Sequence, residues 1–174
     1  MRFARIVLVV SVPAALAACA DNSAYERQLR EALDQAEITL IDAIDVGEAE
    51  TAEAVGVRAA LLVGTDPVYS VETHAAGTVR ALHIDIVTGV VLSASEAGAA
   101  SSDCAQAIAL TEALSIAEAR VGGEAVAVVW DDDEPCAREI QVLTDPELME
   151  VKVAASGRIL EVEESDEDGG IDDD

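Results

Sequence analysis

The feature that most constrains the fold is a pattern that occurs twice: one helical segment followed by several short β-type segments. The first helical segment opens at Ser23, which forms a capping-box pattern with Glu26. Its apolar residues recur at steps of three or four, as one face of a helix requires: Leu29, Leu33, Ala36, Leu40 and Ile44. Turn signals separate four short β-type runs, which are 57–63, 68–73, 78–87 and 90–93. This order predicts an α+β fold with the helix across one face of an antiparallel sheet.

The second occurrence begins where Asp103 and Gln106 can cap a helix. The helical stripe that follows is Ala107, Leu110, Leu114, Ala117 and Val121. The β-type runs after it are 124–130, 138–144, 148–154 and 158–162. Pro67 and Pro135 are 68 residues apart, and so are Gly89 and Gly157, which suggests a duplicated unit. A unit of roughly 60 residues is marginal alone, so we expect the two small sheets to pack together or to share an edge.

The first hairpin can be assigned a register from its side-chain pattern. A two-residue loop at Ala76-Gly77 places Tyr69 opposite Ile84 and Val71 opposite Leu82, so that all four apolar side chains share one face. A three-residue loop would place Tyr69 opposite His83 and divide the apolar set. The two-residue loop is therefore predicted.

The amino-terminal residues have the order of an export signal: Arg2 and Arg5, an apolar run over 6–16, and then small residues. Leu16-Ala17-Ala18-Cys19 resembles the bacterial lipobox, in which the cysteine is lipidated and, with residues 1–18 removed, becomes the first residue of the mature chain. Cleavage before Asp21 by ordinary signal peptidase is the first alternative, and retention of the segment as an uncleaved anchor is the second. We expect a lipid-anchored protein on the periplasmic side of the cell envelope, or a soluble exported one.

The charge balance narrows the function. Asp and Glu number 35 against 10 Lys and Arg, a formal charge of −25, which argues against nucleic acid as the ligand. Residues 164–174 are predicted to be a disordered acidic tail, with specific calcium binding as the sharper alternative. The acidic segment 131–134 is predicted to be a hairpin turn with its charges in water.

Catalytic chemistry has little support. The only two histidines, His74 and His83, are expected on the outward face of the hairpin with Glu72 and Asp85. A metal or acid–base cluster there is conceivable, but a solvated sheet face is the favoured interpretation. Phosphate-binding, nucleophile-elbow, metalloprotease and Cys-x-x-Cys motifs are absent from the sequence. We expect a protein without enzymatic activity, cofactor or metal.

Cysteine usage predicts one crosslink. If Cys19 is lipidated, Cys104 and Cys136 remain in an oxidising compartment. Cys104 is expected in the first turn of the second helix, and Cys136 at the start of the second strand after it. We predict a disulfide between them in the layer between helix and sheet; two buried free thiols are the alternative.

The first hairpin carries Tyr69 and Val71 in its first strand, and Asp85, Thr88 and Gly89 form the turn before a short last strand. On these residues the chain shows a resemblance to the PepSY domain family. It covers residues 39–98 as a first unit, after a tether and helix start at 19–38. It extends weakly over 101–163, where Arg138 replaces Tyr69 and Val153 replaces Asp85.

The resemblance implies an envelope protein that binds, and inhibits or modulates, a peptidase or another envelope protein. The alternative is an acidic envelope protein that buffers divalent cations through its charge and its tail. Deleting residues 164–174 distinguishes the two functions. The deletion should abolish calcium binding if the protein buffers cations, whereas capture of the partner protein should survive if it is a binding module.

Overall fold

The computed structural model describes residues 22–99, 104 and 107–165, which form an α+β fold. The helices are α1 (Asn22–Leu33), α2 (Leu40–Ala49) and α3 (Leu110–Val121). The strands are β1 (Val55–Leu62), β2 (Val68–Ala75), β3 (Thr78–Asp85), β4 (Val91–Ala99), β5 (Glu124–Trp130), β6 (Arg138–Leu143), β7 (Leu148–Val153) and β8 (Ile159–Glu164).

All eight strands belong to one antiparallel sheet, in the order β4-β3-β2-β1-β5-β6-β7-β8. The expected sheets are therefore too small, since the strands form one sheet of eight, but the expectation that the two sets of strands could share an edge is confirmed by the pairing of β1 with β5. Pairing satisfies backbone groups that an edge strand would leave open, which is the physical reason for the merger.

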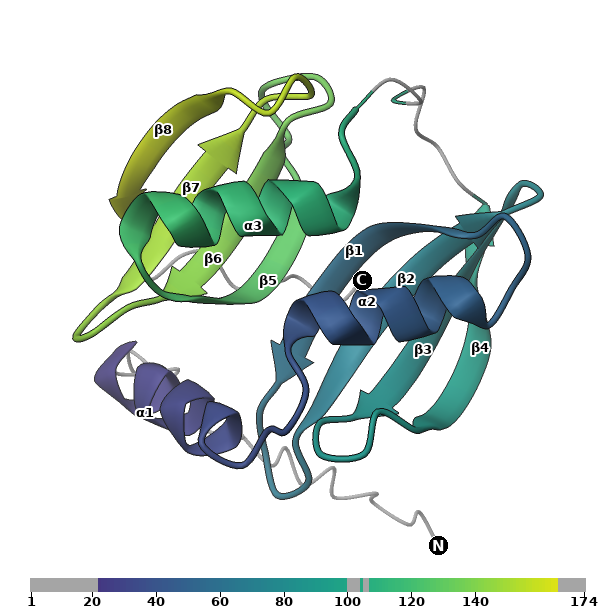
Figure 1. Cartoon of the computed structure of the whole chain (residues 1–174), viewed down its shortest axis with the longest axis horizontal. Helices are drawn as coiled ribbons and strands as arrows, with labels where there is room; N and C mark the ends of the chain where they lie inside the picture. The colour runs from purple at the N-terminus through teal and green to yellow at the C-terminus, as the bar shows by residue number, and fades with distance from the viewer. Residues whose placement is uncertain (1–21, 100–103, 105–106, 166–174) are drawn as a thin grey trace, which may run out of the picture.

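Helices α2 and α3 lie across the same face of the sheet (Figure 1). Their apolar stripes and the inward side chains of the strands form one core of small aliphatic residues, to which Tyr69 contributes the one large aromatic ring. Helix α1 lies beside the lower end of the second set of strands in Figure 1, although it precedes the first set in sequence. The Arg30 guanidinium donates to the carbonyl oxygen of Pro146 at 2.5 Å, which ties α1 to the β6–β7 turn.

The first helical segment is not one helix but two. The chain leaves the helix after Leu33 and starts again at Leu40, with Thr39 as N-cap. The Thr39 hydroxyl accepts from the Asp42 amide, and the Asp42 carboxylate accepts from the Thr39 amide, so the capping box forms here. Ser23 is inside α1 rather than at its cap. The stripe we identified spans both helices because each presents its apolar face to the same core.

Helix α3 starts at Leu110, after Ala109 as N-cap with no side-chain cap. Cys104 therefore precedes the helix instead of lying in its first turn, which corrects our placement. The predicted cap of Asp103 with Gln106 lies outside the described residues. The helix ends at Gly122, whose φ of +79° is a conformation that glycine adopts without strain.

The predicted hairpin register is confirmed. Tyr69 pairs with Ile84 and Val71 with Leu82, and all four side chains are buried. Ala76 and Gly77 form the two-residue loop, with φ of +50° and +84°. Two positive φ values in succession are typical of the turn that matches the twist of a tight hairpin.

The strands follow the expected runs closely, with β5 correct to the residue. The largest deviation is β4, which extends to Ala99 where we expected a run of 90–93. Its residues after Ser93 are small and polar or carry one charge, so they give no alternating apolar signal. Pairing with β3 extends the strand instead.

The first half (residues 40–99, α2 to β4) and the second half (residues 110–164, α3 to β8) correspond closely. Each half has a bulge in its first strand, at Val57 and at Val126. Glu48 accepts from the Gly56 amide, and Glu118 accepts from the Ala125 amide at the corresponding place. The two halves meet where Ala59 of β1 pairs with Val128 of β5. These two residues hold the same position in their own halves, so the junction has the arrangement of a local two-fold axis.

Candidate functional site

The residues that resemble the PepSY motif surround the segment before α2. The Tyr69 hydroxyl donates to the Ile38 carbonyl oxygen at 2.9 Å, and burial raises the pKa of that hydroxyl. The Ile86 carbonyl oxygen accepts from the amides of Glu37 and Ile38. Gly89 lies against Ile38, since a Cβ built on the glycine would be 3.7 Å from Ile38 Cδ1.

Asp85 and Thr88 close the turn that presents Gly89. The Asp85 carboxylate accepts from the Thr88 amide at 2.7 Å and from the Thr88 hydroxyl at 2.8 Å. These hydrogen bonds, with one from the Val87 amide, lower the pKa of Asp85. The motif residues Tyr69, Asp85, Thr88 and Gly89 thus hold the turn and the helix start in place, whereas Val71 is a buried core residue.

The histidines are not brought together. His83 pairs with Ser70, whereas His74 pairs with Val79, four positions further along β2. At about 3.3 Å per residue, that is roughly 13 Å along the strand. Over the described residues, no group of three or more His, Cys, Asp and Glu side chains is arranged to hold a metal ion.

Cys104 and Cys136 form the predicted disulfide, with 5.4 Å between their Cα atoms. Cys136 has a φ of +62° and lies just before β6, and Cys104 lies on the segment that leads to α3. The bond therefore links the approach to the helix with the β5–β6 turn, because Cys136 lies two residues before β6 and not at the start of the strand as we expected.

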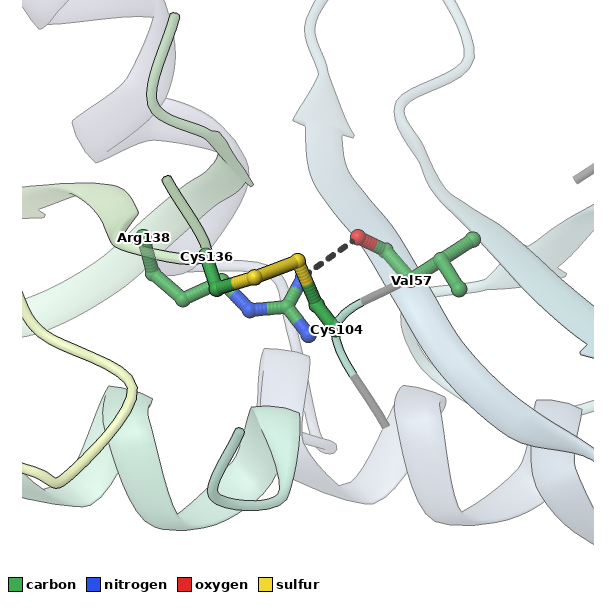
Figure 2. The surroundings of a disulfide bond; sticks show 4 residues. All are labelled: Val57, Cys104, Cys136 and Arg138. Carbon is green, nitrogen blue, oxygen red and sulfur yellow. Dashed lines mark hydrogen bonds between the residues drawn. A yellow bond between two sulfur atoms is a disulfide. The ribbon is translucent and has the colours of Figure 1, made fainter. Parts of the chain in front are cut away.

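Arg138, which follows this turn, occupies the ladder position that Tyr69 holds in the first half, but it makes different contacts. Its Nη1 donates to the Val57 carbonyl oxygen of β1 at 2.8 Å, as Figure 2 shows beside the disulfide. Its Cζ lies 3.2 Å from the centroid of the Trp130 ring. The side chain is only 4% exposed, and this burial lowers its pKa to about 10. Val57 is the bulge residue of β1, so Arg138 supplies a hydrogen bond that the bulge removes from the ladder.

The strand alignment also corrects the residue of the second half that corresponds to Asp85. Asp85 donates its amide to the Val90 carbonyl, and Ala154 donates its amide to the Arg158 carbonyl at the same point of the second half. Ala154, not Val153, therefore stands where Asp85 stands. The offset between the halves shifts by one residue because the final turn of the second half is shorter.

A hollow of about 770 Å³ lies on the sheet face that α2 and α3 leave open. Its apolar lining includes Val57, Ala127 and Val129, and Trp130 borders it. Two cations line it, Arg58 and Lys152. Seven carboxylates line it: Glu72, Asp131, Asp132, Asp133, Glu139, Glu150 and Glu163. Because Arg58 and Glu72 belong to the first half, the hollow spans the junction of the halves.

Asp131 shapes one wall of the hollow. Its carboxylate accepts from the amides of Asp133 and Glu134, and lies 2.7 Å from the Lys152 ammonium. Burial raises the pKa of Asp131, but the Lys152 and Glu134 hydrogen bonds outweigh it and leave that pKa below the ordinary value. The segment 131–134 is a turn, as predicted. The expectation that all its charges face water is wrong for Asp131, whose side chain is 2% exposed.

Glu150 lies among like charges in the same hollow. It pairs with Glu163 of β8, and Glu139 lies diagonally from it on β6. Burial, and then the negative charges of Glu139 and Glu163, raise the pKa of Glu150 to about 7. A positive group entering the hollow would relieve this repulsion.

Sequence reasoning missed this hollow. The signal that could have found it is the alternation of β6 and β7, where Glu139, Gln141, Glu150 and Lys152 alternate with buried aliphatic residues. That pattern marks an outward face but not its concavity, which depends on the twist of the whole sheet.

Comparison with known proteins finds one similar solved structure and no matching family. No family model and no curated protein matches the chain. A crystal structure of a candidate lipoprotein from Clostridium difficile 630 is similar at 22% sequence identity and a TM-score of 0.45; the match covers 74% of this chain and 94% of the other.

The predicted export signal and acidic tail lie largely outside the residues that the structure describes. Cys19, the cleavage sites and most of the acidic tail lie outside the described residues. Among the described helices, none has the length and apolar character needed to cross a membrane.

Proposed function

We propose that this protein is a non-enzymatic binding module of the bacterial envelope, and that the hollow over β1 and β5–β8 holds a positively charged segment of a partner protein. The observation that carries the proposal is the composition of the hollow: seven carboxylates against two cations on an uncovered sheet face. One of the cations, Lys152, is already paired with Asp131. The negative potential there is therefore strong, and these carboxylates belong to a chain whose overall formal charge is −25.

The partner class follows from the resemblance to the PepSY family, which implies binding and inhibition or modulation of a peptidase or another envelope protein. A Lys- or Arg-bearing loop would gain from the carboxylates, while Val57, Ala127 and Val129 offer apolar surface beneath it. A hollow that combines apolar lining with charged walls suits a peptide segment better than a single ion.

The location and the internal duplication are parts of the same proposal. Lipidation at Cys19 would anchor the protein to a membrane of the envelope and keep the hollow near its partner. Two PepSY-like tandem units fit the matched bulges at Val57 and Val126. They also fit the matched turns at Gly89 and Gly157, which pack against Ile38 and Ile108.

Site-specific crosslinking tests the binding role. A photoreactive residue at Gln141, which lines the hollow, should capture one discrete envelope protein in intact cells. The control is the same photoreactive residue at Ser115, on the exposed surface of α3 and outside the hollow. Adduct at Gln141, loss of it in the Glu139→Gln/Glu150→Gln variant and no adduct at Ser115 would support the proposal. Equal capture at both positions would contradict it.

A calcium titration distinguishes binding of a partner protein from the alternative function, which is buffering of divalent cations. Isothermal titration of the full chain should give no saturable calcium site, and deletion of 164–174 should leave the crosslink at Gln141 in place. A stoichiometric calcium site that disappears with residues 164–174 would favour the alternative instead.

A further inference from the structure

One row of side chains crosses the hollow from an apolar end to an acidic end. Ala127 of β5 pairs with Gln141 of β6, Gln141 with Glu150 of β7, and Glu150 with Glu163 of β8. All four residues line the hollow. The row therefore begins at a methyl group on β5 and ends at two carboxylates, and it contains no cation.

The neighbouring row of the same sheet face has its charges balanced. There Lys152 lies between Glu139 and Glu161, so that the charges alternate across the strands. Glu150 instead lies directly opposite Glu163, and like charges in that position are unfavourable. A cation supplied by a partner would offset this repulsion at the acidic end of the row.

The apolar end of the row has room for a side chain. The Ala127 side chain ends at Cβ, whereas Trp130 and Gln141, which line the same hollow, are much longer. Val57 and Val129 line it as well, so this end offers aliphatic surface without a polar group. Such a surface gains from an apolar side chain and gives nothing to a charged one.

We propose that the hollow recognises two side chains of one extended partner segment. An apolar side chain lies against Ala127 and Val129, and a lysine or arginine side chain lies at Glu150 and Glu163. This inference rests on the proposed function, since it takes the occupant to be a positively charged segment. It adds the second side chain and the spacing between the two.

The sheet sets that spacing. Ala127 and Glu150 are two strands apart, and because neighbouring strands are about 4.8 Å apart, roughly 10 Å separates them. In an extended segment, residues two positions apart lie on one side at a separation of about 6.6 Å. The long stem of a lysine or arginine spans the rest. Adjacent residues point to opposite sides, so they cannot both face the hollow.

Peptide probes test the spacing on the full chain. The first probe is a blocked glycine–serine peptide with one leucine and one lysine two positions apart, and the second is its isomer with the two adjacent. Fluorescence of Trp130, the only tryptophan, reports binding in the hollow. The first probe should bind roughly tenfold more tightly, because the isomer can place only one of its two side chains. At about pH 8, above the pKa of about 7 that Glu150 has, the carboxylates are ionised.

Single replacements in the first probe separate the two side chains. Replacing its leucine with serine should weaken binding roughly tenfold, because the apolar contact is lost. Replacing its lysine with glutamine should weaken binding roughly fivefold, because the charge is lost.

Variants of the protein assign each preference to one end of the hollow. Glu150→Gln/Glu163→Gln should abolish the preference for lysine over glutamine and keep the preference for leucine over serine. Val129→Ser should do the reverse. The matched controls are Glu147→Gln/Glu164→Gln and Val55→Ser, which change exposed residues outside the hollow and should alter neither preference.

The outcomes separate this inference from the function on which it rests. If the lysine probe binds no more tightly than the glutamine probe, the proposed function fails, and the inference with it. If lysine is required but the isomer or the serine probe binds as tightly as the first probe, the proposed function stands and the two-side-chain pattern is overturned. The pattern is also overturned if the control variants change the preferences as much as the variants in the hollow.

Discussion

The two halves share their order of elements, their bulges and their turns, but they differ in what fixes the helix to the sheet. In the first half, the buried Tyr69 hydroxyl donates to the Ile38 carbonyl oxygen just before α2. In the second half, the corresponding Arg138 donates to Val57 in the other half. The approach to α3 is then held by the Cys104–Cys136 disulfide. The side chain at this ladder position thus donates within its own half in the first case and to the neighbouring half in the second.

The largest test of this difference removes the disulfide. The variant Cys104→Ser/Cys136→Ser should lose about 3–4 kcal/mol of unfolding free energy, because the bond closes a loop with a sequence separation of 32 residues. Urea unfolding followed by the fluorescence of Trp130, the only tryptophan, measures it. The reduced native protein should match the variant. A loss below about 1 kcal/mol would mean that the second half does not depend on the crosslink.

The next test removes the link between the halves. Arg138→Met should lose about 1–3 kcal/mol, because the Val57 carbonyl is left without its hydrogen bond in a partly buried place. The emission of Trp130 should also shift, since the guanidinium lies on its ring. Arg158→Met changes an exposed arginine of the same half and should have little effect. Equal effects of the two substitutions would refute the role of Arg138.

A smaller effect on stability is expected from changing Tyr69, which holds the position of Arg138 in the first half. Tyr69→Phe keeps the ring in the core and deletes the hydrogen bond to Ile38, so it should cost about 0.5–1.5 kcal/mol. Thermal unfolding of Tyr69→Phe beside Tyr25→Phe, whose ring is exposed, gives the comparison. If the two variants have the same stability, the tyrosine does not anchor the helix start through its hydroxyl.

The smallest effect concerns Glu150. Its pKa in the folded protein is about 7, above the ordinary 4.5, so the folded protein binds this proton more tightly than the unfolded chain does. The resulting loss of stability is absent below 4.5, grows as pH rises to about 7 and is constant above that. Glu150→Gln should therefore stabilise the protein near pH 8, by less than about 1 kcal/mol after solvent screening, and have no effect near pH 4. Chemical denaturation at the two pH values measures it, with the exposed Glu147→Gln as control. A gain that is equal at both would contradict the assignment.

The sequence predicted local features best where neighbouring residues determine them. The pairing of Tyr69 with Ile84 followed from side-chain alternation and loop length, and the Cys104–Cys136 bond from cysteine count and compartment. The break between α1 and α2 was missed, because Leu33, Leu40 and Ile44 keep a helical spacing across it. The signal was present in Thr39 and Asp42, a second capping box within the same apolar stripe.

The hollow could not be predicted from any one segment. Arg58, Glu72, Glu139 and Glu150 come from strands of both halves and share a surface only after β1 pairs with β5. Likewise, nothing near Arg138 in sequence indicates that it reaches Val57.

By itself, the sequence determined the α+β class, the strands, the hairpin register and the disulfide partners. These depend on periodicity, on turn chemistry and on a small set of cysteines, all of which act over short stretches of chain. Only the tertiary structure decided that the strands form one sheet, that α1 packs against the second half and that the carboxylates gather in one hollow. Those outcomes depend on which edges and faces meet. Edges that are far apart in the chain pair through backbone groups that every residue type except proline supplies in full, so side-chain patterns within one segment do not identify the partner edge.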